Sequence, residues 1–430
     1  MKPQLRRELS LFDTVNLVIG TIVGADIYIV AAYGAGSLGP ASILAWFLAG
    51  LMAVMIALVF SEASGILPVT GGPYAYAGEA LGRFAGFLTG WSLWISSWIA
   101  IAVFPIAFVY YLEYFIPLNS IWEAVIKVLF IVSLTLINIA GVGRAGKVND
   151  VLTVLKVAPV LLLAILGAVY LALHPTTLSG NYTPLAPMGL GALGGVTVLV
   201  FWAYVGFELV TVPADEVKNP ERNIPLAITL GMVFVMLFYL LTNAVILGLV
   251  PWRVLAASTA PLTVAGYSLM GGLGALILTS GAVFSIAGSE EAGMLTTARL
   301  LFAMSRDGFL PRALSRVHGR FGTPHVSILI QNLTALAAAL TGTAAGLIEL
   351  SVLTLLLPYA TTCVSLGILR RREGAAVPVK SVLGVLICIY LLLNTTAGTL
   401  IAGVLLITGG VPLYLIFRWR NSKNNKGCRK

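Results

Sequence analysis

The chain has 430 residues, of which 59% are hydrophobic and only 10% charged, and its mean hydropathy is +0.97. A soluble core of this size does not require so little charge. Apolar runs of about 20 residues, the length that crosses a bilayer as a helix, recur along the whole chain. This composition argues against a soluble protein and predicts an all-α, polytopic membrane protein.

Twelve membrane spans are predicted from these apolar runs. Their approximate bounds are 11–35, 41–67, 86–115, 121–140, 149–173, 192–213, 224–249, 271–304, 326–344, 346–369, 381–396 and 398–418. No cleavable signal peptide is expected before them, because residues 1–10 are short, polar and basic. We treat residues 1–420 as a single transmembrane domain and residues 421–430 as a basic tail.

The basic residues are unevenly distributed between the two sides of these spans. With the N-terminus inside, most of them fall in cytoplasmic segments, and Arg253 is the clear exception on the opposite side. By the positive-inside rule, both termini are therefore predicted to be cytoplasmic. The net charge of +9 is assigned to membrane topology and not to nucleic-acid binding. The cytoplasmic basic residues include Lys2, Arg6, Arg7, Arg144, Lys147, Arg312, Arg316, Arg320, Arg370, Arg371, Arg372 and those of the tail from 418 to 430.

Two predicted spans carry an acidic residue beside a glycine near their middle. The first contains GTIVGADIY, in which Gly24 precedes Asp26 by two residues, and the sixth contains FWAYVGFELV, in which Gly206 precedes Glu208 by two. The sixth span lies five crossings after the first, an odd number, so the two enter the membrane in opposite directions. This pattern is expected of an inverted repeat whose broken helices form a substrate site at the bilayer centre.

A broken helix needs both a flexible backbone and new hydrogen-bond partners. Glycine lowers the cost of leaving helical geometry, and the freed amides and carbonyls then require a ligand, an ion, water or a side chain. A single glycine is more simply explained by close packing between helices. Two glycines beside acids in symmetric spans favour broken helices. The repeats are placed at 11–173 and 192–369, followed by two peripheral helices at 381–418.

Four segments resemble the amino acid–polyamine–organocation superfamily of secondary transporters. IGTIVGADIY is similar to its first-span motif, and Phe201–Ile228 to its sixth span and the following loop. Glu62–Trp91 resembles its second-to-third-span segment, and Ala298–Pro311 the end of its eighth span. The resemblance implies a leucine-transporter-type fold of five plus five inverted spans with two peripheral helices, and transport by alternating access.

Members of this superfamily commonly hold an α-amino acid between the broken helices. The resemblance implies that the substrate carboxylate would rest on first-span amides and its ammonium on carbonyls of the first and sixth spans. Helix N-termini also favour an anionic group on electrostatic grounds. The amides correspond to Gly24, Ala25 and Asp26, and the sixth-span carbonyls lie near Trp202, Ala203 and Val205.

The chain departs from the family motif at Asp26, where a second glycine is usual, and at Tyr28, where Phe is usual. A carboxylate at this cradle of amides would repel a substrate carboxylate and attract an ammonium group. We expect Asp26 to replace the carboxylate of the substrate, which favours amines such as putrescine, agmatine, cadaverine or a monoamine. Asp26 could instead be a protonated acid that caps the broken helix, or a sodium ligand.

Further acids within the spans are functional candidates, because an acid in a membrane interior normally faces the bundle interior or a water-filled cavity. Glu208 is such a candidate for substrate binding; alternatively, it gates the site or supports the unwound backbone. In the eighth span Glu290 and Glu291 lie about 100° apart on a helix, so only one can face the cavity, and we favour Glu290. Aromatic side chains near the breaks can form a cation–π wall and a gate. The predicted substrate site comprises Ile22, Gly24, Ala25, Asp26, Tyr28, Phe201, Trp202, Ala203, Tyr204, Val205, Gly206, Glu208 and Glu290.

Lys156 stands alone within the fifth span, in TVLKVAPVLLLAILG. A buried lysine can lose its proton far more easily than an exposed one, so it can serve as a proton carrier. By the family resemblance, its ammonium would lie against the first and eighth spans, where sodium-coupled relatives bind an ion. Lys156 is therefore the predicted ion-coupling residue, and a lysine that snorkels to the interface is the alternative.

Enzymatic activity is not predicted. His174, His318 and His325 fall in loops or at span ends, so neither a metal site nor a hydrolytic site is expected at membrane depth, and no cofactor is expected. The predicted function is secondary active transport of amino acids or amines. Transport would be sodium-independent and either proton-coupled or exchanging, with a bias toward cationic amines or polyamines set by Asp26. The alternative is a general permease for neutral or cationic amino acids, in which Asp26 has a structural or proton-carrying role.

Overall fold

The computed structural model describes residues 9–69, 71–141, 145–211, 214 and 217–417, with the side chains of 145–152 left out. Over these residues the chain is helical, apart from turns and an isolated bridge between Leu9 and Val217. The basic residues before Leu9, Arg144 and the tail at 421–430, on which the predicted orientation partly rests, lie outside the described residues. The side chain of Lys147 is also outside them.

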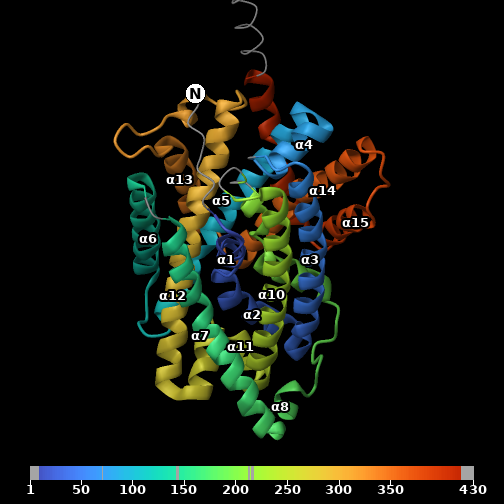
Figure 1. Ribbon diagram of the computed structural model, residues 1–430. Coiled ribbons are helices and arrows are strands. Elements are labelled where there is room, and N and C mark those ends of the chain that lie inside the picture. Colours follow the sequence, from blue (N-terminus) through green and yellow to red (C-terminus); the bar gives the residue numbers. More distant parts are fainter. Residues whose placement is uncertain (1–8, 70, 142–144, 212–213, 215–216, 418–430) are drawn as a thin grey trace, which may run out of the picture.

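The helices follow one another through a single bundle (Figure 1). They are α1 (Leu11–Ile22), α2 (Ala25–Leu38), η1 (Gly39–Ala41), α3 (Ser42–Ile66), α4 (Pro73–Leu81), α5 (Arg83–Glu113), α6 (Ser120–Ala140), α7 (Ala145–Leu173), α8 (Pro175–Tyr182), α9 (Leu193–Phe201), η2 (Trp202–Tyr204), η3 (Phe207–Thr211), α10 (Pro220–Leu249), α11 (Trp252–Ala256), α12 (Pro261–Arg306), η5 (Arg312–Ser315), α13 (His325–Thr341), α14 (Ala344–Arg372), α15 (Val379–Leu393) and α16 (Ala397–Thr408).

The described chain contains nine segments that are long and apolar enough to cross a membrane, together with three shorter apolar helices. One of the nine, Ala25–Ile66, runs from the predicted first span through the whole second span. The three shorter helices are α1, α13 and α15. Each predicted span thus coincides with an apolar helix, which confirms the all-α polytopic architecture.

Local sequence signals set several helix ends. Ser10 and Asp13 form a reciprocal capping box at the start of α1. Asn119 accepts a hydrogen bond of 3.0 Å from the amide of Trp122 and so caps α6. The predicted start of the eighth span at 271 is confirmed, because Gly271, with φ 64° and ψ −149°, separates a short helix that begins at Pro261 from the long helix that follows it within α12. The two pieces double back on each other, since the hydroxyls of Thr263 and Thr279 lie 2.8 Å apart.

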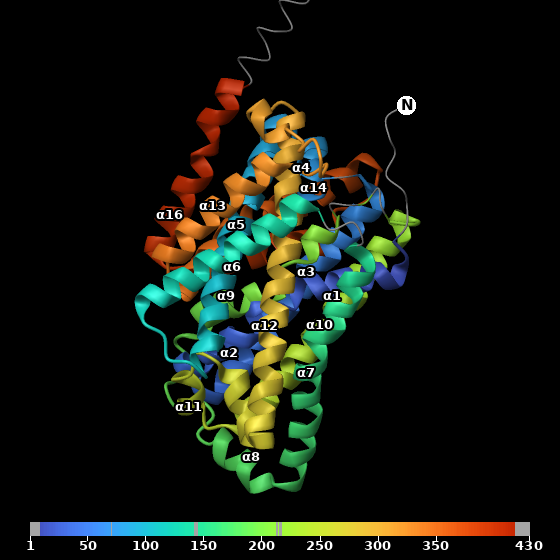
Figure 2. The same ribbon diagram turned by 90° about the vertical axis from the view of Figure 1, so that its left-hand side faces the viewer.

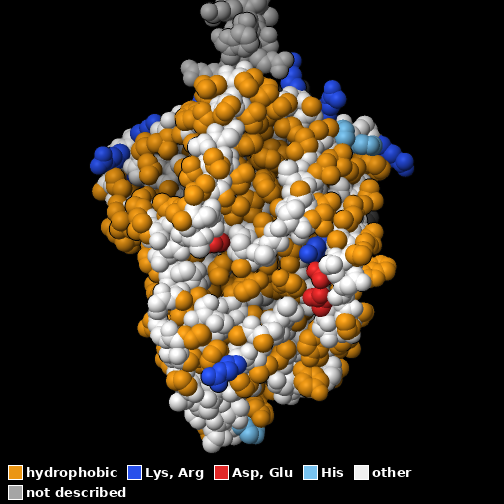
Figure 3. Space-filling model, turned by 180° about the vertical axis from the view of Figure 1, so that it is seen from behind, with side chains coloured by type: hydrophobic (Ala, Val, Ile, Leu, Met, Phe, Trp, Pro, Cys, Tyr) orange, Lys and Arg blue, Asp and Glu red, His pale blue; other side chains and the backbone are white. Residues whose placement is uncertain are grey.

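The bundle places the broken spans at its centre. α10 packs against α3, α14 against α5, and α12 against both α5 and α7. In two perpendicular views the short helices α8 and α11 lie at the lower end, and α4 lies at the upper end (Figures 1 and 2). Hydrophobic side chains cover most of the face seen in Figure 3, and few charged side chains interrupt them. This surface suits a helical bundle surrounded by lipid.

Candidate functional site

The first span is interrupted between α1 and α2. α1 ends at Ile22, Val23 is extended with a ψ of 100°, and Gly24 has φ −138° and ψ −139° before α2 begins at Ala25. A side chain at position 24 would have little room, because a Cβ there would lie 3.2 Å from both the ring of Phe104 and the hydroxyl of Ser289. The break therefore needs glycine for close packing as much as for flexibility.

Asp26 turns its carboxylate back onto the start of its own helix. The Oδ1 atom accepts hydrogen bonds from the amide of Gly24 at 2.9 Å and from the amide of Ile27 at 2.7 Å. The hydroxyl of Tyr239 on α10 lies 3.3 Å from each carboxylate oxygen. Asp26 is 4% exposed. Its side chain thus takes up backbone donors that the start of a helix otherwise offers to an anion.

Glu208 makes the same arrangement in the sixth span. Its Oε2 atom accepts from the amide of Gly206 at 3.0 Å and from the hydroxyl of Tyr359 at 2.9 Å. Gly206 has a φ of +127°, and a Cβ there would lie 2.7 Å from the carbonyl oxygen of Thr21. Each glycine-x-acid element is therefore a backbone break closed by its own carboxylate, with a tyrosine from a neighbouring helix as a further donor.

Lys156 on α7 connects the broken span to α12. Its Nζ atom donates to the carbonyl of Gly20 at 3.1 Å and to the hydroxyl of Ser289 at 2.9 Å. The hydroxyl of Ser289 in turn lies 3.0 Å from the carbonyl of Val23. Lys156 is 1% exposed, so its side chain is enclosed by protein and does not reach an interface.

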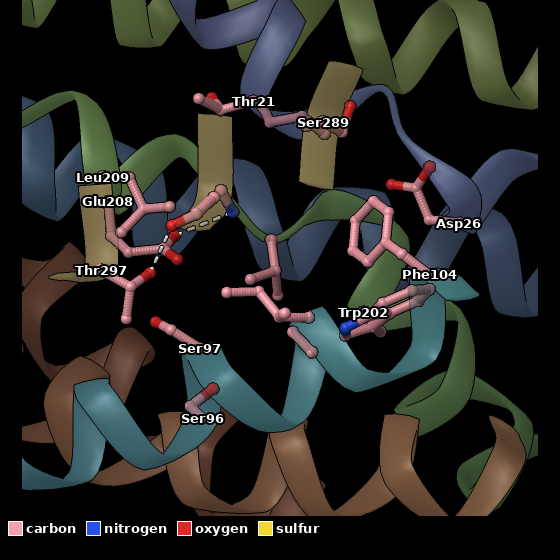
Figure 4. A pocket seen from close by; sticks show the side chains of 16 residues that line it. Thr21, Asp26, Ser96, Ser97, Phe104, Trp202, Glu208, Leu209, Ser289 and Thr297 are labelled. Atoms are coloured by element: carbon pink, nitrogen blue, oxygen red, sulfur yellow. Dashed lines mark hydrogen bonds between the residues drawn. The ribbon is translucent and has the colours of Figure 1, made fainter. Parts of the chain in front are cut away.

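A cavity with about 660 Å³ of empty space, part of it open to solvent, lies between the two breaks. In Figure 4, Asp26 lies with Phe104 and Trp202 on one side, and Glu208 lies with Ser97 and Thr297 on the other. The cavity therefore has an aromatic end and a hydroxyl-rich end, each with one carboxylate. Its lining residues are Thr21, Ile22, Asp26, Ser96, Ser97, Ala100, Ile101, Phe104, Trp202, Val205, Gly206, Glu208, Leu209, Ser289, Gly293 and Thr297.

The structure brings part of the predicted site to this cavity. The predicted residues in its wall are Ile22, Asp26, Trp202, Val205, Gly206 and Glu208. The others are absent from the wall: Gly24, Ala25, Tyr28, Phe201, Ala203, Tyr204 and Glu290. Glu290 is fully buried elsewhere on α12, because the face of that helix toward the cavity carries Ser289, Gly293 and Thr297.

The aromatic residues behind the wall hold the breaks in place. The hydroxyl of Tyr28 donates to the carbonyl of Lys156 at 3.3 Å, and that of Tyr204 donates to the carbonyl of Trp46 at 3.1 Å. The rings of Tyr204 and Tyr239 lie 5.4 Å apart. Phe201 packs against Tyr359, with ring centroids 6.2 Å apart. These contacts support the two carboxylates from outside the cavity.

Several residues of this arrangement were not predicted from the sequence. They are Thr21, Ser96, Ser97, Phe104, Tyr239, Ser289, Thr297 and Tyr359. The adjacent serines in "WISSWIA" and the polar "GSEEAG" stretch are visible signals in apolar spans. The two tyrosines carry no such signal, since single tyrosines are unexceptional in membrane helices.

Comparison with known proteins gives relatives that match most of this chain. A family model described as amino acid permease matches residues 9–417. The branched-chain amino acid permease BcaP of Bacillus subtilis is 28% identical, over 98% of this chain and 95% of its own. The methylthioribose transporter of the same organism is also 28% identical, with the same coverage of 98% and 95%. The vacuolar cationic amino acid transporter 4 of Arabidopsis thaliana is 31% identical over 88% of this chain and 66% of its own.

A solved structure supports the fold independently of close sequence similarity. MhsT in complex with L-phenylalanine matches with a TM-score of 0.65 at 12% identity, over 92% of this chain and 99% of that chain. This likeness confirms the predicted leucine-transporter-type architecture with its two broken helices. Together with the family model, it identifies a multi-pass membrane transporter and not an enzyme. The chain belongs to the amino acid permease family.

Proposed function

We propose that the protein is a sodium-independent secondary transporter whose preferred substrates are small amines or polyamines. The substrate lies between the broken helices, with its ammonium groups toward Asp26 and Glu208. The observation that carries this proposal is the pair of hydrogen bonds from Gly24 and Ile27 to Asp26. The carboxylate of the protein occupies amides on which a substrate carboxylate would otherwise rest.

The charges of the cavity support an amine. Its lining includes two carboxylates, Asp26 and Glu208, and none of its sixteen residues is Lys, Arg or His. A substrate carboxylate about 4 Å from ionised Asp26 would be repelled by about 4 kcal/mol at an effective dielectric constant of about 20. An ammonium at the same distance gains a comparable attraction. Trp202 and Phe104 add aromatic faces beside Asp26 on which a cation can rest.

Lys156 supports coupling to protons instead of sodium. Its ammonium donates to Gly20 and Ser289 between α1 and α12, where sodium-coupled relatives would bind an ion. A fixed cation there replaces the sodium ion, and loss of its proton would release α1 from α12. The proposal includes alternating access, repeats at 11–173 and 192–369, and cytoplasmic placement of both termini.

The second candidate function is a general amino acid permease in which Asp26 only caps α2. Two of the relatives are named for branched-chain and for cationic amino acids. In this function the hydrogen bonds from Gly24 and Ile27 to Asp26 serve only to close the start of the helix. However, the relatives are not all named for amino acids, since another is named for methylthioribose, which is not an amino acid.

Uptake into proteoliposomes separates the two functions. The purified protein would be given an inward proton gradient, and uptake of labelled putrescine and agmatine would be compared with uptake of arginine, alanine and leucine. Amine uptake that alanine and leucine do not inhibit supports the proposal. Alanine or leucine uptake that amines do not inhibit would reject it in favour of the general permease. Replacing sodium with potassium on both sides of the membrane should leave amine uptake unchanged.

A further inference from the structure

A second polar cluster lies outside the cavity wall, between α6, α12 and α13. We define the cluster as Thr135 and Asn138 on α6, Glu290 on α12, and Gln331 and Asn332 on α13; Asn138 and Gln331 contact Met294, which lies one turn after Glu290 on α12. Their exposed fractions are 8%, 1%, 0%, 0% and 2%, respectively. A glutamate at this depth is costly, and the transport site described above does not use it.

Met294 fixes the position of Glu290 relative to the neighbouring helices. The two residues are four apart on α12 and therefore share a face of the helix. The backbone carbonyl of Met294 accepts from Gln331 Nε2 at 3.1 Å, and its sulfur lies 4.0 Å from Asn138 Nδ2. This face of α12 is therefore turned toward α6 and α13, away from the cavity.

The amide nitrogens of the cluster donate to nearby acceptors, which fixes the orientation of each side chain. In the described part of the chain, the amide oxygens are left without a donor. Asn138 Nδ2 donates to the carbonyl of Leu134 at 3.2 Å, and Gln331 Nε2 donates to a carbonyl as well. Asn332 Nδ2 donates to the hydroxyl of Thr135 at 2.8 Å, and that hydroxyl donates onward to a backbone carbonyl. Exchanging oxygen and nitrogen in any of these amides would lose its bond.

The cluster therefore presents buried acceptors. Among the described residues, neither the carboxylate oxygens of Glu290 nor the side-chain oxygens of Asn138, Gln331 and Asn332 have a hydrogen-bond partner. An ionised carboxylate in such surroundings is uncompensated, which costs several kcal/mol. A protonated carboxyl group removes the charge and provides an O–H donor on the face of α12 that is turned toward α6 and α13.

We propose that Glu290 is a proton-binding site of the transporter, distinct from Lys156. It is a carboxylic acid while the cluster is closed, and it becomes a carboxylate by releasing its proton to water when the packing of α12 against α6 and α13 opens during transport. This inference rests on the proposed transport function, because it assigns a proton to the transport cycle.

Ser289 connects this site to the broken span. It is adjacent to Glu290 on α12, and its hydroxyl contacts Lys156 and the carbonyl of Val23. α12 thus carries Glu290 on one face and the contact with α1 on the neighbouring face. A charge that forms at Glu290 loosens the packing of α12 and, through Ser289, biases the position of α1.

Glu290 is the titratable side chain of the cluster, because the other titratable residues near α12 belong to a different part of the bundle. On the elements packed against α12, the central titratable side chains in the described part of the chain are Lys156 on α7, Asp26 and Tyr28 on α2, Tyr111 on α5 and Tyr239 on α10. These five belong to the α1–α2 break and its supports. Glu291 occupies a different face of α12. The residues that α6 and α13 contribute to the cluster do not titrate; they are Thr135, Asn138, Gln331 and Asn332.

The remaining charged side chains on the elements packed against α12 lie near helix ends, on short helices or elsewhere along the periphery. They are Asp13 on α1, Arg83 and Glu113 on α5, Glu123 and Lys127 on α6, Glu221 and Arg222 on α10, Arg253 on α11, Arg299 and Arg306 on α12 itself, Arg312 on η5 and His325 on α13. Within the described residues, none of them forms a hydrogen bond or an ion pair with the cluster.

Infrared difference spectroscopy on the purified, substrate-free protein tests the site without relying on transport. Glu290→Gln keeps the size of the protonated side chain, and Glu291→Gln is the matched control on the next residue. We expect a protonated-carboxyl band that weakens as the pH is raised, that is missing in Glu290→Gln and that persists in Glu291→Gln. A band that is absent, or one that does not respond to pH, would overturn the proposal.

Transport gives the second readout. In proteoliposomes, each coupled proton adds up to about tenfold substrate accumulation for an inward gradient of one pH unit. Glu290→Gln should lower accumulation by up to about tenfold while exchange at equal pH continues, and Glu291→Gln and Glu290→Asp should retain it. Unchanged accumulation in Glu290→Gln would overturn the proposal. The proposal would also be overturned if wild-type transport required sodium or potassium at constant pH and Glu290→Gln removed that requirement, because Glu290 would then bind a metal cation. If the wild type accumulates none of the compounds tested, the proposed transport function is wrong. The infrared experiment then still tests whether Glu290 binds a proton.

Discussion

Replacing Asp26 with Asn tests the charge of the site while preserving its backbone geometry. The amide oxygen of Asn can still accept from Gly24 and Ile27, so the cap at the start of α2 remains. The lost contribution is the charge-assisted part of the interaction with an ammonium group. Hydrogen bonds to a charged group contribute about 1.5–3 kcal/mol, which corresponds to roughly 10- to 150-fold in affinity.

The assay is competition by unlabelled putrescine against labelled substrate in proteoliposomes, with the wild type and Asp26→Asn compared at the same pH. Thermal unfolding of both proteins provides the control, and the unfolding free energy should change by only about 1 kcal/mol because neutral hydrogen bonds replace charged ones. We expect the inhibition constant for putrescine to rise by the factor above. An unchanged constant in a folded Asp26→Asn protein would refute the role of Asp26 as an ammonium partner.

Asp26→Gly goes further, because it removes the carboxylate and returns the backbone amides to the cavity. We expect this variant to bind amines more weakly and amino acids with a free carboxylate more strongly. The measurement is the ratio of agmatine to arginine uptake. If the substrate profile of Asp26→Gly equals that of the wild type, Asp26 does not stand in for a substrate carboxylate.

Three further variants test the surrounding framework. Lys156→Ala should lower proton-driven accumulation by up to about tenfold, and unchanged accumulation would remove Lys156 from coupling. Glu208→Gln can still accept from Tyr359, so we expect weaker amine transport in a folded protein, whereas unaltered amine affinity would leave Glu208 a purely structural role. Gly206→Ala should unfold the protein or abolish transport, because its φ is +127° and its Cβ would collide with backbone. The matched control Gly398→Ala meets nothing within 4 Å and should retain full uptake.

The membrane architecture could be predicted because it depends on local composition. Apolar runs identify spans without any knowledge of their neighbours, and paired glycine-x-acid elements marked both broken helices. Boundaries were less predictable where the backbone changes direction. The short helix between Pro261 and the turn at Gly271, and α8, lie outside the predicted spans, because short helices outside the apolar runs have no hydropathy signal.

The candidate site could be predicted only in part. Residues on the broken segments, such as Asp26 and Glu208, are identifiable because an acid in a span requires an explanation. Their tyrosine partners, Tyr239 and Tyr359, come from α10 and α14, and their roles depend on packing that no local pattern encodes. Glu290 shows the same limit, since the choice between two adjacent faces of α12 depends on its neighbouring helices.

Agmatine and arginine provide the most direct test of whether the protein supplies the carboxylate that a substrate would otherwise bring. The two compounds differ only in the α-carboxylate, so equilibrium binding of each to the purified wild type isolates that group. We predict that agmatine binds at least about tenfold more tightly, and that Asp26→Gly reduces or reverses this preference. Tighter binding of arginine than agmatine to the wild type would contradict the assignment of Asp26 and favour a general amino acid permease.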